Sequence, residues 1–249
     1  MKKETWFTYQ TVQKGPLTIT VEDLQKTRGS KYPPFPPKHR LLKIEYPSKI
    51  KNLEQGIRDG IKKCCINMLK PPIRDIGLPG IQKWAEAVAK WPNQFNDLSL
   101  FSCLFNTFVY IEISGTGGSA FRTMYAKFLQ EAGAILNNPD LREVADIFEE
   151  SARTWSEVAK SALPDSWPRL RSIRERIIEK NRYLEKQEEN ALGKMLKIDA
   201  EIGKLVENVR KNFGKENFSP LLSSLQRNIM SCCRQEAKAF QTLYTVMKQ

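Results

Sequence analysis

Apolar side chains recur every three or four residues through the middle of this chain, and prolines interrupt the pattern at intervals. This spacing is that of helices with one buried face, and proline ends a helix because it has no backbone N–H. The last of these faces follows Asn138, Pro139 and Asp140, a sequence typical of a helix start. The faces span residues 50–69, 81–88, 121–136 and 141–159. We therefore predict an α-helical bundle over residues 49–171.

The segment 172–249 carries a different pattern. Its apolar residues alternate at spacings of four and three, as in the seam of a coiled coil, at Ala191, Met195, Ile198, Ile202, Leu205 and Val209. We expect one long helix from Ser172 to about Phe213, a turn at Gly214–Pro220, and a second helix from Leu221 to Met247. The seam can close against the second helix as a hairpin, or against another copy of the chain as a dimer.

Residues 1–48 are predicted to contain short β-strands. Runs rich in β-forming residues occupy Trp6–Val12, Leu17–Thr20 and Leu41–Tyr46. Between them, Thr20 and Asp23 have the spacing of a cap for a short helix that ends near Arg28. So few strands cannot form a stable sheet alone, so they must pack on the helices, on a second copy or on another polypeptide. The predicted fold is mainly α: a helical bundle with a long C-terminal helical hairpin and a few short N-terminal β-strands.

The formal net charge of +12 is unevenly distributed, because the two ends of the chain are basic and the middle is acidic. A basic excess can attract nucleic acid, an anionic membrane or an acidic protein such as an acyl carrier protein, or it can be ordinary solvated surface. The longest apolar run, Leu98–Ile113, is too short to span a bilayer, so no membrane segment is expected. Five cysteines, with two adjacent pairs, do not suit a disulfide framework and favour a reducing cytoplasm.

No complete catalytic set is visible. A cysteine or serine nucleophile needs a base, and His39, the only histidine, lies between two basic residues in a proline-rich loop. The adjacent cysteine pairs at 64–65 and 232–233 lack the C-x-x-C spacing that directs two thiolates at one ion. We therefore expect these thiols to be packing residues, and we expect no metal and no cofactor.

A glycine-rich stretch, Gly115–Ala120, fits the G-x-G-x-x-A form of the dinucleotide-binding fingerprint. That fold needs a strand before it, for which Phe108–Ile113 is the candidate, and a second strand after the next helix, which the pattern lacks. A helix entry with tight turns and close packing is the simpler interpretation. Such a helix start can also bind a phosphate or carboxylate. The candidate ligand residues are Gly115, Gly117, Gly118, Ser119, Arg122 and Tyr125.

Two segments carry a family resemblance, Leu17–Leu42 (LTITVEDLQKTRGSKYPPFPPKHRLL) and Gly115–Ala132 (GTGGSAFRTMYAKFLQEA). Both resemble the butirosin biosynthesis protein H family, whose members join a papain-like, Cys/His-dependent acyltransferase domain to a helical C-terminal domain of unassigned role. In that family the catalytic Cys and His precede the matching segments, and this chain is expected to begin after both. The resemblance implies a helical domain that accompanies transfer of an acyl group from a carrier protein to an amine.

Three functions follow from these patterns. The first is a non-catalytic helical binding or assembly module, in which residues 1–48 are a remnant of the papain-like domain, 49–171 a helical bundle and 172–249 a helical hairpin extension. The second is one half of a split acyltransferase, completed by a partner chain that supplies the Cys and His. The third, from a different class, is a basic nucleic-acid-binding helical protein. A homodimer and an acyl carrier protein are the other partners that we consider.

Overall fold

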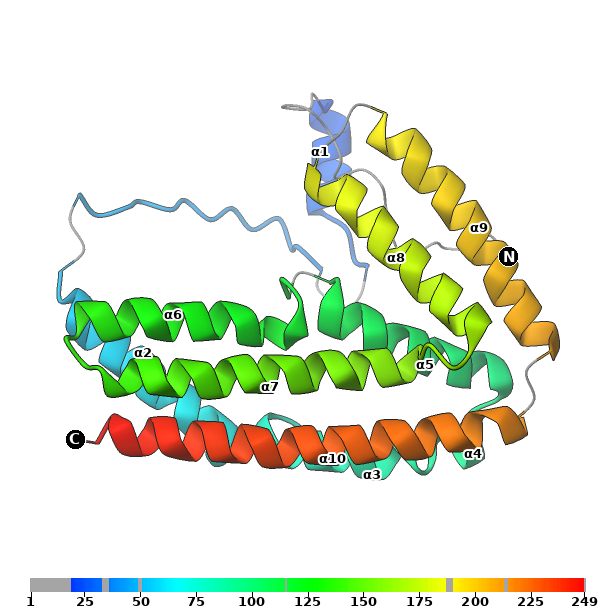
Figure 1. The fold of residues 1–249 in the computed structure, drawn as a ribbon. Coiled ribbons are helices and arrows are strands. Elements are labelled where there is room, and N and C mark those ends of the chain that lie inside the picture. The colour runs from blue at the N-terminus through cyan, green and yellow to red at the C-terminus, as the bar shows by residue number, and fades with distance from the viewer. Residues whose placement is uncertain are drawn as a thin grey trace.

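The computed structural model describes residues 19–32, 36–48, 51–114, 116–186, 190–212 and 215–248, and within them every regular element is helical (Figure 1). A short 3-10 turn, η2 (Ser119–Phe121), precedes α6. The α-helices are α1 (Val21–Arg28), α2 (Leu53–Leu69), α3 (Gly77–Val88), α4 (Trp91–Gln94), α5 (Asp97–Glu112), α6 (Arg122–Ile135), α7 (Asp140–Ala162), α8 (Pro168–Lys186), α9 (Ala191–Asn212) and α10 (Lys215–Val246).

Helix α7 is the centre of the bundle. It packs against α5, α6 and α10, and α10 in turn packs against α2 and α3 (Figure 1). Two apolar clusters fill the space between these helices. One gathers α3, α5, α8 and the first half of α10 around residues such as Leu104 and Leu225. The other gathers α2, α6 and the second half of α10 around Phe148 and Leu243. Both clusters include side chains of α7 and α10, so these two helices hold the bundle together.

The predicted helices of the bundle are confirmed, and their ends have local causes. Helix α2 stops at Leu69, just before Pro71 and Pro72, because proline cannot continue the backbone hydrogen-bond pattern. The backbone N–H of Asp140 at the start of α7 donates to Asn138 Oδ1 at 3.1 Å. The apolar run at 98–113 belongs to α5 up to Glu112, so the strand considered for Phe108–Ile113 is wrong.

The short helix at residues 20–28 is also confirmed. Thr20 Oγ1 accepts a hydrogen bond from the backbone N–H of Asp23 at 3.1 Å and donates to its carboxylate at 2.7 Å, as the spacing predicted. The predicted strand at Leu41–Tyr46 is wrong in the described part of the chain, because these residues are extended but pair with no other segment. The runs at 6–12 and 17–18 lie outside the described residues.

The helical hairpin does not lie where the sequence predicted it, because the region expected to be one long helix from Ser172 contains two helices, α8 and α9. Helices α8 and α9 pack against each other, joined by an ion pair of 2.8 Å between Lys180 Nζ and Asp199 Oδ1. The predicted second helix, α10, instead starts at Lys215 and returns to the bundle beside α7. The seam residues Ala191 and Met195 are buried within the chain itself. We call the α8–α9 pair the arm; in Figure 1 it rises at an angle from the bundle.

Candidate functional site

The glycine-rich stretch forms a turn between α5 and α6 whose backbone has positive φ angles. The φ angle is positive at five successive residues, from +65° at Gly117 and +85° at Gly118 to +69° at Phe121. Two glycines adopt this region freely, but a non-glycine residue pays a steric penalty of about 1–2 kcal/mol there. Thr116 stabilises the start of the turn, since its hydroxyl donates to the Ile111 carbonyl at 2.8 Å and accepts from the Gly118 N–H at 3.2 Å.

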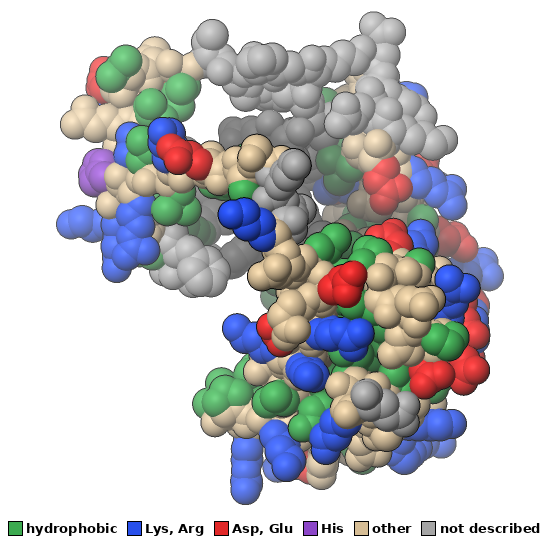
Figure 2. Space-filling model, turned by 90° about the vertical axis from the view of Figure 1, so that its left-hand side faces the viewer, with side chains coloured by type: hydrophobic (Ala, Val, Ile, Leu, Met, Phe, Trp, Pro, Cys, Tyr) green, Lys and Arg blue, Asp and Glu red, His purple; other side chains and the backbone are tan. Residues whose placement is uncertain are grey.

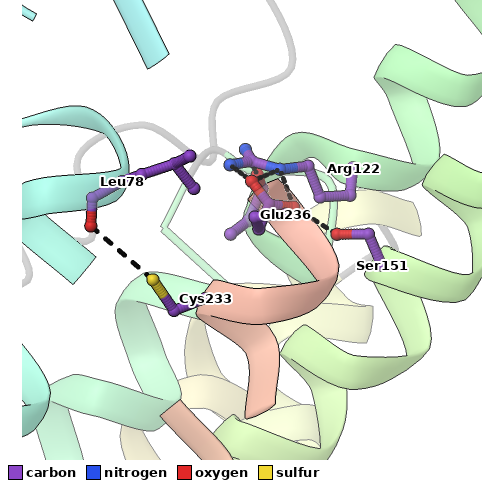
Figure 3. A network of polar contacts seen from close by, with 6 residues as sticks. Leu78, Arg122, Ser151, Cys233 and Glu236 are labelled. Carbon is purple, nitrogen blue, oxygen red and sulfur yellow. Dashed lines mark hydrogen bonds and ion pairs between the residues drawn. The ribbon is translucent and has the colours of Figure 1, made fainter. Parts of the chain in front are cut away.

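A buried ion pair fixes the end of the turn. Arg122, the first residue of α6, donates from Nε to both carboxylate oxygens of Glu236 in α10, at 2.9 and 3.0 Å (Figure 3). Its Nη1 donates to the carbonyl of Ala120 at 2.8 Å, inside the turn. Glu236 is fully buried and also accepts a hydrogen bond from Ser151 of α7. Three helices and the turn therefore meet at one guanidinium and one carboxylate.

Aromatic rings complete the surroundings of this ion pair. The Arg122 guanidinium carbon lies 5.5 Å from the ring centre of Trp155 and 5.9 Å from that of Phe240. Burial by itself would lower the pKa of Arg122, but the hydrogen bonds and charge of Glu236 outweigh it and raise the pKa above its ordinary value. The guanidinium is thus permanently charged and fully engaged by groups of the chain. The arrangement is a structural one that holds the helices together, and we call the Arg122–Glu236 ion pair with its Ser151 hydrogen bond the lock.

Tyr125, one turn further along α6, also points into the protein. Its ring packs edge-on against Phe148 at 4.9 Å, and its buried hydroxyl has no hydrogen-bond partner of good geometry among the described residues. Burial first, and then the neighbouring Cys64 thiol, raise the pKa of Tyr125 well above its ordinary value. Tyr125 is therefore a neutral core residue.

The surface beside the turn is hollowed. A groove of about 490 Å³ lies between α6 and α7, lined by Ser119, Thr123, Lys127, Glu149, Ala152, Arg153, Ser156 and Glu157. At its edge the hydroxyls of Ser119 and Ser156 are 3.0 Å apart, and Ser156 donates to Glu112 Oε1 at 2.7 Å. The groove offers hydroxyls and both signs of charge, so a small polar ligand with amino or hydroxyl groups fits its chemistry.

The structure separates the residues that the sequence grouped as one ligand site. Gly117 and Gly118 shape the turn, and Ser119 lines the groove. Arg122 and Tyr125 lie on the opposite, buried side of the turn. Gly115 lies outside the described residues. The dinucleotide interpretation is wrong, because helices and not strands flank the turn.

The family described as "Domain of unknown function (DUF4872)" matches residues 22–195, well over half of the chain. The chain belongs to this family. No curated protein and no solved structure matches this chain. The part that matches the DUF4872 family includes the turn, Arg122 and Ser151 but not Glu236, so the buried lock joins the family's segment to a helix beyond it.

Sequence reasoning did not identify Glu236 and Ser151 as parts of the site. A signal existed for Glu236, because a carboxylate interrupts the apolar face formed by Cys232, Ala239 and Phe240 in α10. A charge on a buried face requires a partner of opposite charge. Arg122 gave the matching signal. Residues four apart lie on the same side of a helix, so Arg122 shares the side of the buried Ala126. Ser151 gave none, because a serine within a helix is common.

Proposed function

We propose that this member of the DUF4872 family is a non-catalytic helical binding and assembly module, related to the C-terminal part of butirosin biosynthesis protein H-like acyltransferases. Both segments that carry the resemblance fall mainly inside the matched residues 22–195. One contains α1 and the loop after it, and the other contains the turn and most of α6. The relation to acyl transfer is therefore a proposal about the surroundings in which this helical domain works.

The observation that carries the non-catalytic proposal is the state of the thiols. Burial raises the pKa of Cys65 to about 12 and also raises the pKa of three others, Cys103, Cys232 and Cys233. Since the thiolate is the nucleophile, burial disfavours the reactive form of these four thiols. Cys64 lies beside the buried Tyr125 hydroxyl.

The only histidine is placed elsewhere. The ring of His39 lies against Gly29, in the loop after α1, where an added Cβ on the glycine would come within 2.8 Å of the ring. Among the described residues, no hydrogen bond joins this ring to a cysteine. A nucleophile and its base must be within hydrogen-bonding reach, so the described residues offer no Cys/His pair.

The groove beside the turn is the binding surface in this proposal. Glu149 and Glu157 supply carboxylates that can pair with amino groups, and Ser119, Thr123 and Ser156 supply hydroxyls. This lining suits a polyhydroxylated amine, which is the class of acceptor that the resemblance implies. A polyanion fits less well, because acidic residues lie among the basic ones in the groove and also over the face in Figure 2.

Two measurements test the proposal. Calorimetric titration with the aminoglycoside kanamycin should show binding that weakens in Glu149→Gln and Glu157→Gln but not in Glu143→Gln, an exposed residue of α7 outside the groove. An assay of acyl transfer from an acyl carrier protein to kanamycin should give no product with this chain alone. Product from the chain alone contradicts the proposal. Product only after a separate Cys/His domain is added would instead identify one half of a split acyltransferase.

A further inference from the structure

Residues 40–47 form an extended segment that leads from the loop after α1 towards α2. In Figure 1 it arches over α6, and in Figure 2 open space separates the part around α1 from the bundle. Among the described residues, none of the backbone groups of residues 41–47 makes a hydrogen bond to another residue. The start of the segment is held in place, because Arg28 Nη2 donates to the His39 carbonyl at 2.7 Å and the His39 N–H donates to the Arg28 carbonyl at 2.9 Å.

The two sides of the segment differ in chemistry. Lys43 and Glu45, two residues apart, form an ion pair of 2.5 Å and so lie on one side. In extended backbone the residues between and around them point to the other side. Those residues are Leu42, Ile44 and Tyr46, which are 84%, 69% and 85% exposed. One side therefore carries both charges beside Leu41, and the other is apolar and uncovered, as in a strand without its sheet.

We propose that two copies of this chain associate through residues 41–47, paired as antiparallel strands about a two-fold axis at Ile44. In such a pair, the numbers of any two directly opposed residues add up to the same value. Ile44 therefore lies opposite the partner's Ile44. Leu42 then lies opposite the partner's Tyr46, and Lys43 lies opposite the partner's Glu45. Directly opposed residues share one face of the ribbon, so its apolar face pairs with itself and its polar face gains two opposite-charge contacts.

This register follows from the order of the residues. Pairing about Lys43 would place two lysines opposite each other, and pairing about Glu45 would oppose two glutamates, which is destabilising in both cases. Pairing about a point between two residues would place the apolar side of one strand on the charged side of the other. Of these registers, only the one about Ile44 pairs apolar with apolar and opposite with opposite charges, as a two-fold symmetric interface requires.

The apolar face of the ribbon needs cover, because a two-stranded ribbon alone is marginally stable in water. Helix α6 lies below the segment in Figure 1 and exposes the large apolar side chains of Met124 and Ile135, next to the exposed Phe121 at the end of the turn. In the proposed dimer these side chains cover the apolar face of the ribbon. The inference is independent of the acyl-transfer proposal, since it rests only on the segment and its own sequence.

The test is the mass of the whole chain by sedimentation equilibrium, with charge-exchanged variants. The wild type is expected to be a dimer whose segment amides are protected from hydrogen exchange. Lys43→Glu and Glu45→Lys each place like charges across both contacts, and each should raise the dimer dissociation constant about tenfold. An equimolar mixture of the two variants should form the heterodimer, because every opposed pair is then of opposite charge. The double exchange, Lys43→Glu with Glu45→Lys, should restore the homodimer.

Lys26→Glu, which alters an exposed ion pair within α1, is the matched control and should leave the dimer unchanged. A monomeric wild type at high concentration overturns the inference. So does a dimer that neither exchange weakens, or a mixture of the two variants that associates no better than each alone. Groove binding of kanamycin is measured on the same variants, so loss of the dimer and loss of ligand binding can be told apart.

Discussion

The bundle and residues 19–48 use their apolar side chains in opposite ways. In the bundle, Phe148, Leu225 and Leu243 are completely enclosed by neighbouring helices. In residues 19–48, Val21 and Tyr46 are more than four-fifths exposed, and α1 buries no residue at all. Both regions show regular apolar patterns, so a pattern determines which side of an element can be buried. Whether that side is buried depends on a partner elsewhere in the chain or on another molecule.

The largest expected effect comes from breaking the lock of the bundle. Glu236→Ala leaves the Arg122 guanidinium, 17% exposed, without its carboxylate, and should lower the free energy of unfolding by about 3–5 kcal/mol. Chemical denaturation measures the loss. Glu150→Ala is the control, because its ion pair with Arg153 is exposed and should be worth less than about 1 kcal/mol. Equal effects of the two substitutions would show that the buried pair is not a lock.

The bundle and residues 19–48 can be compared by truncating one apolar side chain in each. Leu243→Ala removes a fully buried side chain of the second cluster and should cost about 2–5 kcal/mol of unfolding free energy. Ile44→Ala removes an exposed side chain and should change the stability of the monomer by less than about 0.5 kcal/mol. Thermal unfolding at low protein concentration measures both. A large loss for Ile44→Ala in a monomer would mean that the segment packs on its own chain.

The turn before α6 gives a smaller effect with a clear sign. Gly117 has a φ of +65° and open space where a Cβ would lie, so Gly117→Ala should cost about 1–2 kcal/mol through backbone strain alone. Gly56 also has open space but lies within helix α2, so Gly56→Ala should stabilise the protein by about 0.5–1 kcal/mol. Urea denaturation of both variants separates backbone strain from steric contact. If both substitutions changed the unfolding free energy in the same direction, backbone strain in the turn would be excluded.

The smallest effect is the pH dependence of the arm. Burial raises the pKa of Asp199 from 3.8 to about 6 and lowers that of Lys180 from 10.5 to about 8, against the attraction of their 2.8 Å contact. The folded arm therefore binds an extra proton at Asp199 between pH 4 and 6, so this contribution to stability falls as the pH rises through that range. Lys180 adds stability as the pH rises from about 8 to 10.5. The contribution of the pair to stability is lowest near neutral pH.

Asp199→Asn tests the acidic limb of this dependence. As the pH falls from about 7 to 4, the wild type should gain unfolding free energy relative to Asp199→Asn, measured by urea denaturation at each pH. Glu201→Gln, which alters the more exposed contact with Arg176 between the same helices, should show no such trend. A difference that stays constant with pH would mean that the Asp199 carboxyl titrates alike in the folded and unfolded chain.

Local features of the fold could be predicted from the sequence, and long-range ones could not. Apolar spacing and proline positions define α2 and α7, and the Thr20 cap defines α1, because these features depend on near neighbours. The hairpin was misplaced because the seam in α9 specifies an apolar face but not the helix that covers it. Leu41–Tyr46 has the alternation of a strand, yet no described segment lies beside it to complete one.

The same limit applies to the candidate site. The sequence identified the turn, but Arg122 and Glu236 are 114 residues apart, and only the packed bundle brings them together. Ser119 could be placed at a helix entry, whereas the groove that it lines is made by Glu149 and Glu157 of α7. No described helix is both long and apolar enough to cross a membrane.

The place of α10 in the bundle has a consequence for synthesis on the ribosome. Both apolar clusters and the carboxylate that neutralises Arg122 depend on α10, which follows every other described helix along the chain. Until α10 has emerged, α7 presents an open apolar face and Arg122 has no counter-ion. Such a partly made bundle is a substrate for chaperones and proteases. Both clusters are therefore closed only when this last described helix docks.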